Sequence, residues 1–285
     1  MIRFIALACL GALLGACTEQ PSASAHDGPA RRVVTLAPHL AEIMFEIGAG
    51  EQLVGVSAWS DYPPEVLDLP RIGDAFAIDQ ERLSLLQPDL LLVWESGMPA
   101  HAVGELRERG YRVESIRTRS LADIATAMRR IGDLTGKRQS AAQAAQRFTR
   151  VFDELAARYR EAESIDVFFE ISARPLYTVN REHFVSEIIA VCGGRNVFED
   201  MSDFAPSVSV EAVLERDPEM LLAGANLGDE AFADWARWQE LAANRHGNHF
   251  LLPDDTVVRP SPRLAQAAAY VCAALDEARK RRRGK

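Results

Sequence analysis

The sequence predicts an α/β protein of two Rossmann-like lobes, each built on a central, mostly parallel sheet, joined by one long rigid backbone helix. Three observations carry this prediction. Short apolar runs alternate with amphipathic stretches, a pattern typical of α/β folds with parallel sheets. The second half of the chain repeats the plan of the first half, and the stretch between the halves keeps an unbroken helical period.

The expected strands are short apolar runs bounded by turn residues. They span residues 33–36, 53–56, 90–94 and 113–116 in the first half, and 166–171, 220–223 and 249–252 in the second. Amphipathic stretches between them predict helices at 40–47, 121–134, 184–191, 210–216, 230–243 and 264–278. Because the alternation runs through both halves, each half is expected to form its own lobe.

One long stretch, residues 140–162, separates the halves. Its apolar side chains recur at the helical period without a Gly or Pro, at Ala141, Ala144, Ala145, Phe148, Val151, Phe152, Leu155 and Tyr159. At the rise of an α-helix, ~23 residues span roughly 35 Å. A helix of that length is expected to connect the lobes as a strut and to resist wide hinge opening.

The first residues predict an export signal that is not part of the fold. Arg3 is the only charge before an apolar run at 4–14, which is too short to span a bilayer stably. The run ends in Leu14-Gly15-Ala16-Cys17, which resembles the lipobox of bacterial lipoproteins. That resemblance implies that Cys17 becomes the lipidated N-terminus and anchors the protein to a membrane. An ordinary cleaved signal peptide is the alternative.

These features divide the chain into six segments. They are a lipoprotein signal peptide at 1–16, a lipidated Cys and flexible tether at 17–30, an N-terminal lobe at 31–138, a linking helix at 139–163, a C-terminal lobe at 164–278 and a basic tail at 279–285. The basic tail is expected to be a solvated end. Without it the chain is even more acidic than its formal charge of −9, which argues against nucleic acid as a partner.

Cysteine usage agrees with export. Cys9 would leave with the signal and Cys17 would take the lipid, so Cys192 and Cys272 are left in an oxidising compartment, where a pair usually bonds. We therefore expect a Cys192–Cys272 disulfide. Two buried free thiols are the alternative.

The sequence lacks the short motifs of common catalytic sites. It has no Gly-x-Ser-x-Gly elbow, no phosphate-binding Gly-Lys-Ser/Thr loop, no His-Glu-x-x-His and no Gly-x-Gly-x-x-Gly. Its six histidines show no i,i+4 pair and no Cys partner, whereas a divalent metal needs three or four converging ligands. We expect a protein that is not an enzyme and holds no metal or cofactor. An α/β metalloenzyme is a less favoured alternative.

A weak internal repeat relates the two halves. Glu81 lies seven residues before Pro88, and Glu211 lies seven residues before Pro218; each proline is followed by an acidic residue and an apolar strand. A second match has the same order in each half: Glu42-Ile43 precedes Gly48 as Glu187-Ile188 precedes Gly193. The repeat predicts duplicated lobes. Acidic residues are also favoured at helix starts, so plain helix capping is the alternative reading of Glu81 and Glu211.

Five segments together resemble a known family. They are Val33-Val34-Thr35-Leu36-Ala37-Pro38, Val54-Gly55-Val56-Ser57-Ala58-Trp59-Ser60-Asp61-Tyr62-Pro63-Pro64, Leu86-Gln87-Pro88-Asp89-Leu90, Val191-Cys192-Gly193-Gly194-Arg195-Asn196-Val197-Phe198 and Ser261-Pro262-Arg263. From about residue 31 to 278 the chain resembles the periplasmic binding proteins with a helical backbone, which carry cobalamin, haem or ferric siderophores to ABC importers. The branch that binds vitamin B12 is the most similar, and its members carry a cysteine pair at matching positions.

The resemblance implies a role for the repeated glutamates. Members of the family dock by one exposed glutamate on each lobe, each of which meets arginines on one subunit of the permease dimer. Glu81 and Glu211 match those positions. Two like charges held apart on a rigid monomer suit a two-fold pair of basic pockets, and such contacts set register and association rate.

Candidate ligand-binding residues lie in loops at the carboxyl ends of the predicted strands, where open α/β sheets bind ligands. They are Pro38, His39, Trp59, Tyr62, Phe76, Tyr177, Phe204, Asp255 and Arg259. Aromatic faces with a few polar groups suit a corrin or porphyrin. Any of these aromatic residues could instead be lobe core. His39 could reach the cleft as a ligand to cobalt or iron, although a lone histidine is more often a hydrogen-bonded one.

The resemblance implies cobalamin as the transported ligand, with haem or a ferric siderophore as the alternative. One departure bears on this choice. Cobalamin-binding relatives place tryptophans in three loops where this chain has Ala75-Phe76, Phe204-Ala205 and Thr256-Val257. Phe76 and Phe204 are neighbouring substitutes, and Thr256 has none. An anionic siderophore would need several basic residues, and only Arg259, Arg174 and Arg181 are available.

Overall fold

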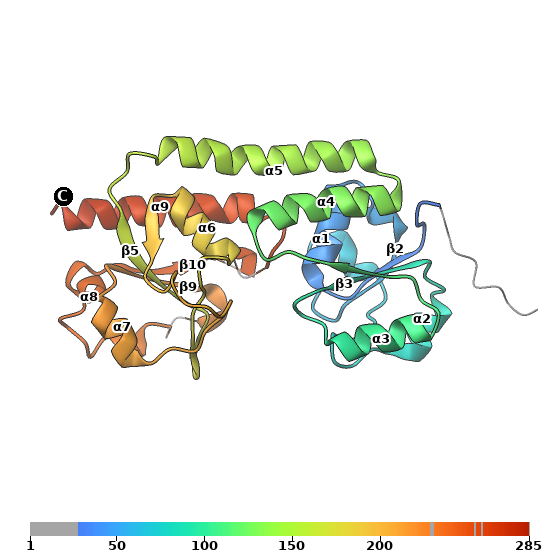
Figure 1. The fold of residues 1–285 in the computed structure, drawn as a ribbon, viewed down its shortest axis with the longest axis horizontal. Helices are drawn as coiled ribbons and strands as arrows, with labels where there is room; N and C mark the ends of the chain where they lie inside the picture. Colours follow the sequence, from blue (N-terminus) through green and yellow to red (C-terminus); the bar gives the residue numbers. More distant parts are fainter. Residues whose placement is uncertain (1–27, 229–230, 254, 258, 285) are drawn as a thin grey trace, which may run out of the picture.

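The computed structural model describes residues 28–228, 231–253, 255–257 and 259–284. The chain forms two α/β lobes side by side, with the helix α5 (Arg138–Arg158) lying across both of them (Figure 1). Cys17, the predicted signal peptide and most of the predicted tether lie outside the described residues.

The N-terminal lobe is built on a parallel sheet with the strand order β2-β1-β3-β4. Its strands are β1 Val33–Thr35, β2 Leu53–Val56, β3 Leu90–Trp94 and β4 Val113–Ile116; its helices are α1 Pro38–Glu46, α2 Gln80–Leu85, α3 Ala100–Glu108 and α4 Leu121–Thr135, with 3₁₀ turns η1 Gly50–Gln52 and η2 Pro64–Asp68. Along β3, Leu90 and Leu92 face one core cluster while Leu91 and Val93 face another. Burial on both faces explains why the strand is one continuous apolar run.

The C-terminal lobe repeats this plan. Its parallel sheet has the order β10-β9-β5-β8, which is the same winding once its strands are counted from β5. The elements are β5 Ile165–Glu170, β6 Ser172–Ala173, β7 Leu176–Tyr177, α6 Phe184–Val191, β8 Gly194–Asn196, α7 Val210–Arg216, β9 Met220–Gly224, α8 Ala242–His246, β10 His249–Leu252 and α9 Leu264–Arg282, with 3₁₀ turns η3 Ala225–Leu227, η4 Ala233–Trp235 and η5 Asp255–Val257. The shared winding confirms the predicted duplication.

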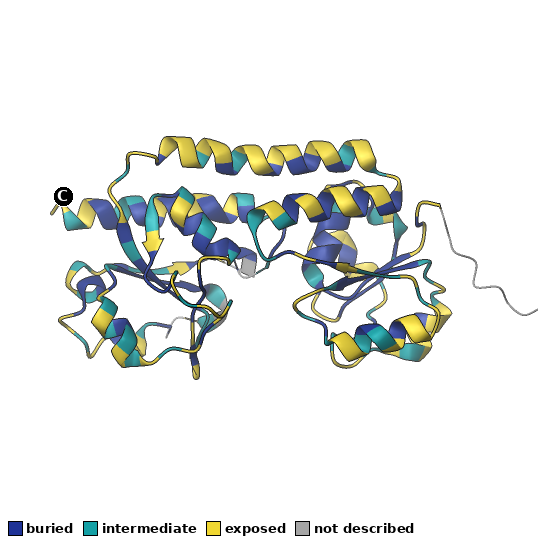
Figure 2. Ribbon diagram, viewed as in Figure 1, coloured by how far each residue is buried: buried dark blue, intermediate teal, exposed yellow. Residues whose placement is uncertain are grey.

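Three helices form a layer on one side of the two sheets. In Figure 1, α4 lies over the N-terminal lobe and α9 over the C-terminal lobe, nearly in line, with α5 above both. The inner stripe of α5 is buried and its outer face is exposed (Figure 2), and the buried side chains include Ala141, Ala145, Phe148 and Phe152. The predicted backbone helix is therefore confirmed, although it ends at Arg158 and a turn carries the chain into β5.

The predicted disulfide is confirmed. Cys192, at the end of α6, is bonded to Cys272 of α9, with Cα atoms 4.9 Å apart. Both side chains are buried. The bond therefore links α6 and α9, the first and last helices of the C-terminal lobe.

The helix predicted at 230–243 is wrong. Within the described part of this segment the chain forms η4 and loops, and α8 begins only at Ala242. The apolar residues Phe232, Trp235, Trp238 and Leu241 recur every third position, and each of the last three donates its N–H to the carbonyl of the one before it. A spacing of three suits successive 3₁₀-type turns, in which residues i and i+3 eclipse, better than an α-helix.

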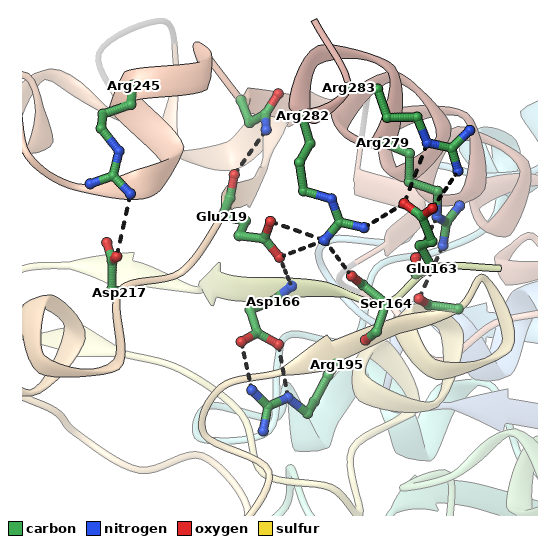
Figure 3. A network of polar contacts seen from close by, with 12 residues as sticks. Glu163, Ser164, Asp166, Arg195, Asp217, Glu219, Arg245, Arg279, Arg282 and Arg283 are labelled. Atoms are coloured by element: carbon green, nitrogen blue, oxygen red, sulfur yellow. Dashed lines mark hydrogen bonds and ion pairs between the residues drawn. The ribbon is translucent and has the colours of Figure 1, made fainter.

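The basic tail is mostly exposed, as expected, but it is not a loose end, because α9 continues to Arg282. Arg279 is buried and donates to the carbonyls of Cys192 (2.7 Å) and Gly193 (3.0 Å). Arg282 bridges Glu163 (2.9 Å) and Glu219 (3.1 Å), and Arg283 also pairs with Glu163 (Figure 3). Acidic groups at the amino ends of β5 and β9 thus hold the end of the helix.

Candidate functional site

The carboxyl ends of the two sheets meet at the junction of the lobes. The backbone N–H of Phe184, at the start of α6, donates to the carbonyl of Arg119, which follows β4, at 3.0 Å. The Arg119 guanidinium lies 4.3 Å from the ring centre of Phe204, which follows β8. Residues that follow strands of the two sheets therefore contact each other across the lobes, in the kind of position where open α/β sheets bind ligands.

Four of the predicted aromatic side chains are exposed, three in loops of the N-terminal lobe and Tyr177 at the end of β7. Trp59 is 72% exposed, Phe76 85%, Tyr62 42% and Tyr177 37%. These values place the four side chains outside the lobe core. The alternative that they are core residues is therefore wrong. Large aromatic side chains that a folded protein leaves exposed commonly belong to a binding surface.

Local hydrogen bonds hold the two most exposed rings outward. Ser57 and Ser60 join their hydroxyls at 2.9 Å and close the turn that carries Trp59. The Asp74 carboxylate accepts the backbone N–H groups of Phe76 (2.8 Å) and Ala77 (2.9 Å), an Asx-type turn. Neither ring depends on core packing for its position.

Phe204 is half-buried and packed. Its ring centre lies 4.7 Å from that of His183, and Arg119 covers it as described above. His183 is the N-cap of α6, with its Nδ1 accepting from the N–H of Val185 at 3.2 Å. Burial, with Arg119 nearby, lowers the pKa of His183 to about 3, so the histidine stays neutral and can accept this hydrogen bond at physiological pH.

The last two predicted ligand-binding residues, Asp255 and Arg259, follow β10. Asp255 begins η5, and its side chain lies outside the described part of the structure. Arg259 donates to both carboxylate oxygens of Asp61, which follows β2, and its NH1 lies 3.7 Å from Glu42 Oε1. The Arg259 partner holds the pKa of Asp61 below its usual range. Arg259, which was predicted to contact the ligand, therefore also forms an ion pair between the two lobes.

His39 does not fit the predicted role as a cleft-lining residue or a ligand to a metal centre. The side chain is 3% exposed; its ring packs edge-on against Trp94, with centres 5.1 Å apart, and its Nε2 lies 3.3 Å from Thr118 Oγ1. Burial, with the positive charge of Arg259, lowers its pKa to about 3. Pro38, the first residue of α1, is half-buried, and the next residue along the helix, His39, packs its side chain toward the sheet.

Sequence reasoning missed a buried carboxylate at the same edge of the second sheet. Glu170 ends β5, is 2% exposed and accepts from Trp235 Nε1 at 2.7 Å. Burial raises its pKa; the Trp235 N–H acts against this, and the nearby Asp234 adds to it. A glutamate that ends an otherwise apolar strand is the signal that could have identified it.

Glu170→Gln is expected to stabilise the protein at neutral pH. Because the folded pKa is raised, the wild-type side chain is at no disadvantage below its ordinary pKa and loses stability as the pH rises toward the folded value. The glutamine keeps an acceptor for Trp235 and removes the buried charge, so the gain is on the order of 1 kcal/mol. Thermal melts should show it at pH 7.5 and lose it at pH 4. A variant that is less stable than wild type at pH 7.5 would contradict the assignment.

The two glutamates of the repeat occupy equivalent exposed positions. Glu81 is in the first turn of α2, which Asp79 caps by accepting the Arg82 N–H, and Glu211 is in the first turn of α7, which Ser209 caps. Both helices lie on the side of the lobes that faces away from α5 (Figure 1). Capping does not account for Glu81, whereas Glu211 also hydrogen-bonds its own backbone N–H and the Ser209 side chain, which lower its pKa.

Two further observations concern metals and membranes. Within residues 28–228, 231–253, 255–257 and 259–284, no three His, Cys, Asp or Glu side chains gather in a way that could hold a metal ion. In the same part of the chain, no helix has the length and apolar character needed to cross a bilayer.

Known proteins are similar to this chain in sequence and in fold. The family model described as periplasmic binding protein matches residues 33–256. A vitamin B12-binding protein of Vibrio cholerae is 33% identical over 264 residues, covering 91% of this chain and 94% of the relative. The crystal structure of a periplasmic vitamin B12-binding protein of Vibrio cholerae matches with a TM-score of 0.78 at 33% identity, covering 88% of this chain and 99% of that one. An apo periplasmic haem-binding protein of a Roseiflexus species, at 24% identity, covers 88% of this chain and 100% of its own with a TM-score of 0.74 and shows the shared fold. The chain belongs to the family of periplasmic binding proteins.

Proposed function

We propose that this protein captures cobalamin, as vitamin B12 or a related corrinoid, between its lobes and delivers it to the permease of an ABC importer. The observation that carries the proposal is the set of exposed aromatic side chains at the carboxyl ends of strands in both lobes, headed by Trp59 and Tyr177. Flat apolar rings with polar groups beside them suit the faces and edge amides of a corrin. The relatives named above as vitamin B12-binding proteins support this ligand.

Haem is the second candidate, because haem-binding proteins share the fold. A haem site normally offers a protein ligand to iron. His39 is buried and His183 is half-buried, and both have lowered pKa values and hydrogen-bonded or packed neighbours. Among the predicted residues this leaves Tyr62, whose ring is covered by Arg263 at 4.3 Å, and Tyr177 to ligate iron. Cobalamin brings its own cobalt ligands and needs neither. A ferric siderophore is disfavoured because Arg259 is paired with Asp61 and Arg174 with Asp234.

The remaining parts of the function are proposed with it. The protein works as a monomer, is not an enzyme and holds no cofactor of its own. After removal of its signal peptide it is anchored by lipid at Cys17 on the periplasmic side of a membrane. Glu81 and Glu211, exposed on helices of the two lobes, contact the two halves of a permease dimer.

Two substitutions test the ligand site directly. Trp59→Ala and Tyr177→Ala are each expected to weaken cyanocobalamin binding by roughly tenfold to a hundredfold, since a buried aromatic contact contributes about 1.5–3 kcal/mol. Leu85→Ala is the control, because Leu85 is 76% exposed as the last residue of α2, ahead of the amino end of β3. Calorimetric titration measures the affinities. Unchanged affinity in both site variants would place the ligand elsewhere.

A further inference from the structure

Two glutamates, one buried and one half-buried, each form a contact between the two lobes. Glu42 is on α1 of the N-terminal lobe and contacts Arg263, the N-cap of α9 in the C-terminal lobe. Glu187 is on α6 of the C-terminal lobe and contacts Leu121, the first residue of α4 in the N-terminal lobe. These are the second pair of glutamates in the internal repeat, and the proposed docking and ligand contacts leave them unused.

The Glu42 contact is a bidentate ion pair. Its Oε2 accepts from Arg263 Nε at 2.9 Å and its Oε1 from Arg263 NH2 at 2.8 Å, with Arg259 NH1 3.7 Å away. The Glu42 side chain is 2% exposed and that of Arg263 15%, so removing one charge leaves the other poorly solvated. A pocket of about 460 Å³ borders the pair and is also lined by α4 and α5.

The Glu187 contact is a single hydrogen bond to a helix start. Its Oε2 accepts the backbone N–H of Leu121 at 2.7 Å. That N–H has no partner within α4, because the first N–H groups of any helix lack one. A carboxylate at this end also meets the positive end of the helix dipole. The contact is therefore favourable but has one hydrogen bond where Glu42 has two.

We propose that Glu42 and Glu187 are reciprocal positioning residues that fix the separation of the lobes. The starts of α4 and α9 point toward each other at the junction of the lobes, beneath α5 (Figure 1). Each glutamate holds the start that belongs to the opposite lobe, so the lobes cannot separate without breaking both contacts. The width of the ligand site depends on this separation; that last step rests on the proposed function.

The separation of the lobes can be measured without any ligand. Spin labels on p-acetylphenylalanine at Ser84 of α2 and Glu215 of α7, both exposed, report the distance between the lobes by double electron–electron resonance. Wild type is expected to give one narrow distribution. Glu187→Ala should broaden it, Glu42→Gln should broaden it further, and the double variant most of all. Glu114→Gln, which breaks an ion pair with Arg130 inside one lobe, should leave it unchanged.

A second readout connects the contacts to binding. If the competent spacing is populated at about a tenth, the apparent Kd for cyanocobalamin rises about tenfold. Should Glu42→Gln fail to fold, Arg263→Gln removes the same pair from the opposite lobe. Distributions in all folded variants that match wild type would overturn the proposal, even if the variants melt at lower temperature. Because the distances are measured without ligand, failure of cobalamin to bind leaves this test intact.

Discussion

Reversing the two charges that we propose for docking, Glu81→Lys with Glu211→Lys, is expected to abolish cobalamin uptake while leaving cobalamin binding unchanged. Both side chains are exposed on helices that face away from α5. A reversed charge would replace attraction to an arginine pocket by repulsion, which costs roughly 2 kcal/mol at each lobe, or about a thousandfold in docking affinity for the pair. Uptake of labelled cyanocobalamin through the cognate permease, beside calorimetry on the purified variant, measures the two effects separately.

The control for this experiment carries the same change in net charge. Glu51→Lys with Glu154→Lys alters two exposed glutamates, one in η1 and one on α5. This variant should transport as wild type does. The docking assignment fails if the Glu81 and Glu211 variant binds ligand and still supports full uptake, or if the control variant loses uptake to the same degree.

Removing the disulfide is expected to cost the most stability of any change considered. Cys192 and Cys272 are separated by 80 residues, and closing a loop of that size stabilises a fold by about 4–5 kcal/mol in the chain-entropy model. Cys192→Ala with Cys272→Ala should therefore lower the melting temperature by about 10 °C. Differential scanning calorimetry measures the shift.

Reduction supplies the matched comparison for that prediction. A reductant should lower the melting temperature of wild type by a similar amount and have no effect on the double alanine variant. If wild type melts at the same temperature with and without reductant, the bond contributes no stability. If the variant also responds to reductant, the effect arises elsewhere.

The sequence was a good guide to the fold because the signals were local. Strands β2, β3, β4 and β10 were predicted with their observed bounds, since each is a short run with turn residues on both sides. The polar edge strand β8 was missed because Gly194–Asn196 has no apolar run, and its pairing with β5 is a long-range event. The segment after residue 230 failed for the opposite reason, because an apolar spacing of three was taken for a helical period.

Contacts across the lobes were beyond local reasoning. The partners Glu42 and Arg263 are 221 residues apart, and no sequence pattern shows that the start of α9 returns to α1. The same holds for His39. Its place after β1 indicated the edge of the sheet correctly, but only the packing of Trp94 and Thr118 around it shows that the ring is buried. The sequence also could not predict whether Trp59, Phe76 and Tyr177 are exposed or belong to the core.

The most direct test of the proposed function is a calorimetric titration of residues 18–285, which leave out the predicted signal peptide and Cys17, with cyanocobalamin, and with haemin as the comparison. We expect saturable one-to-one binding of cyanocobalamin at sub-micromolar affinity and no specific haem absorption band. Absence of heat with cyanocobalamin, together with a new haem band that Tyr177→Phe removes, would contradict cobalamin as the ligand and assign the protein to haem uptake.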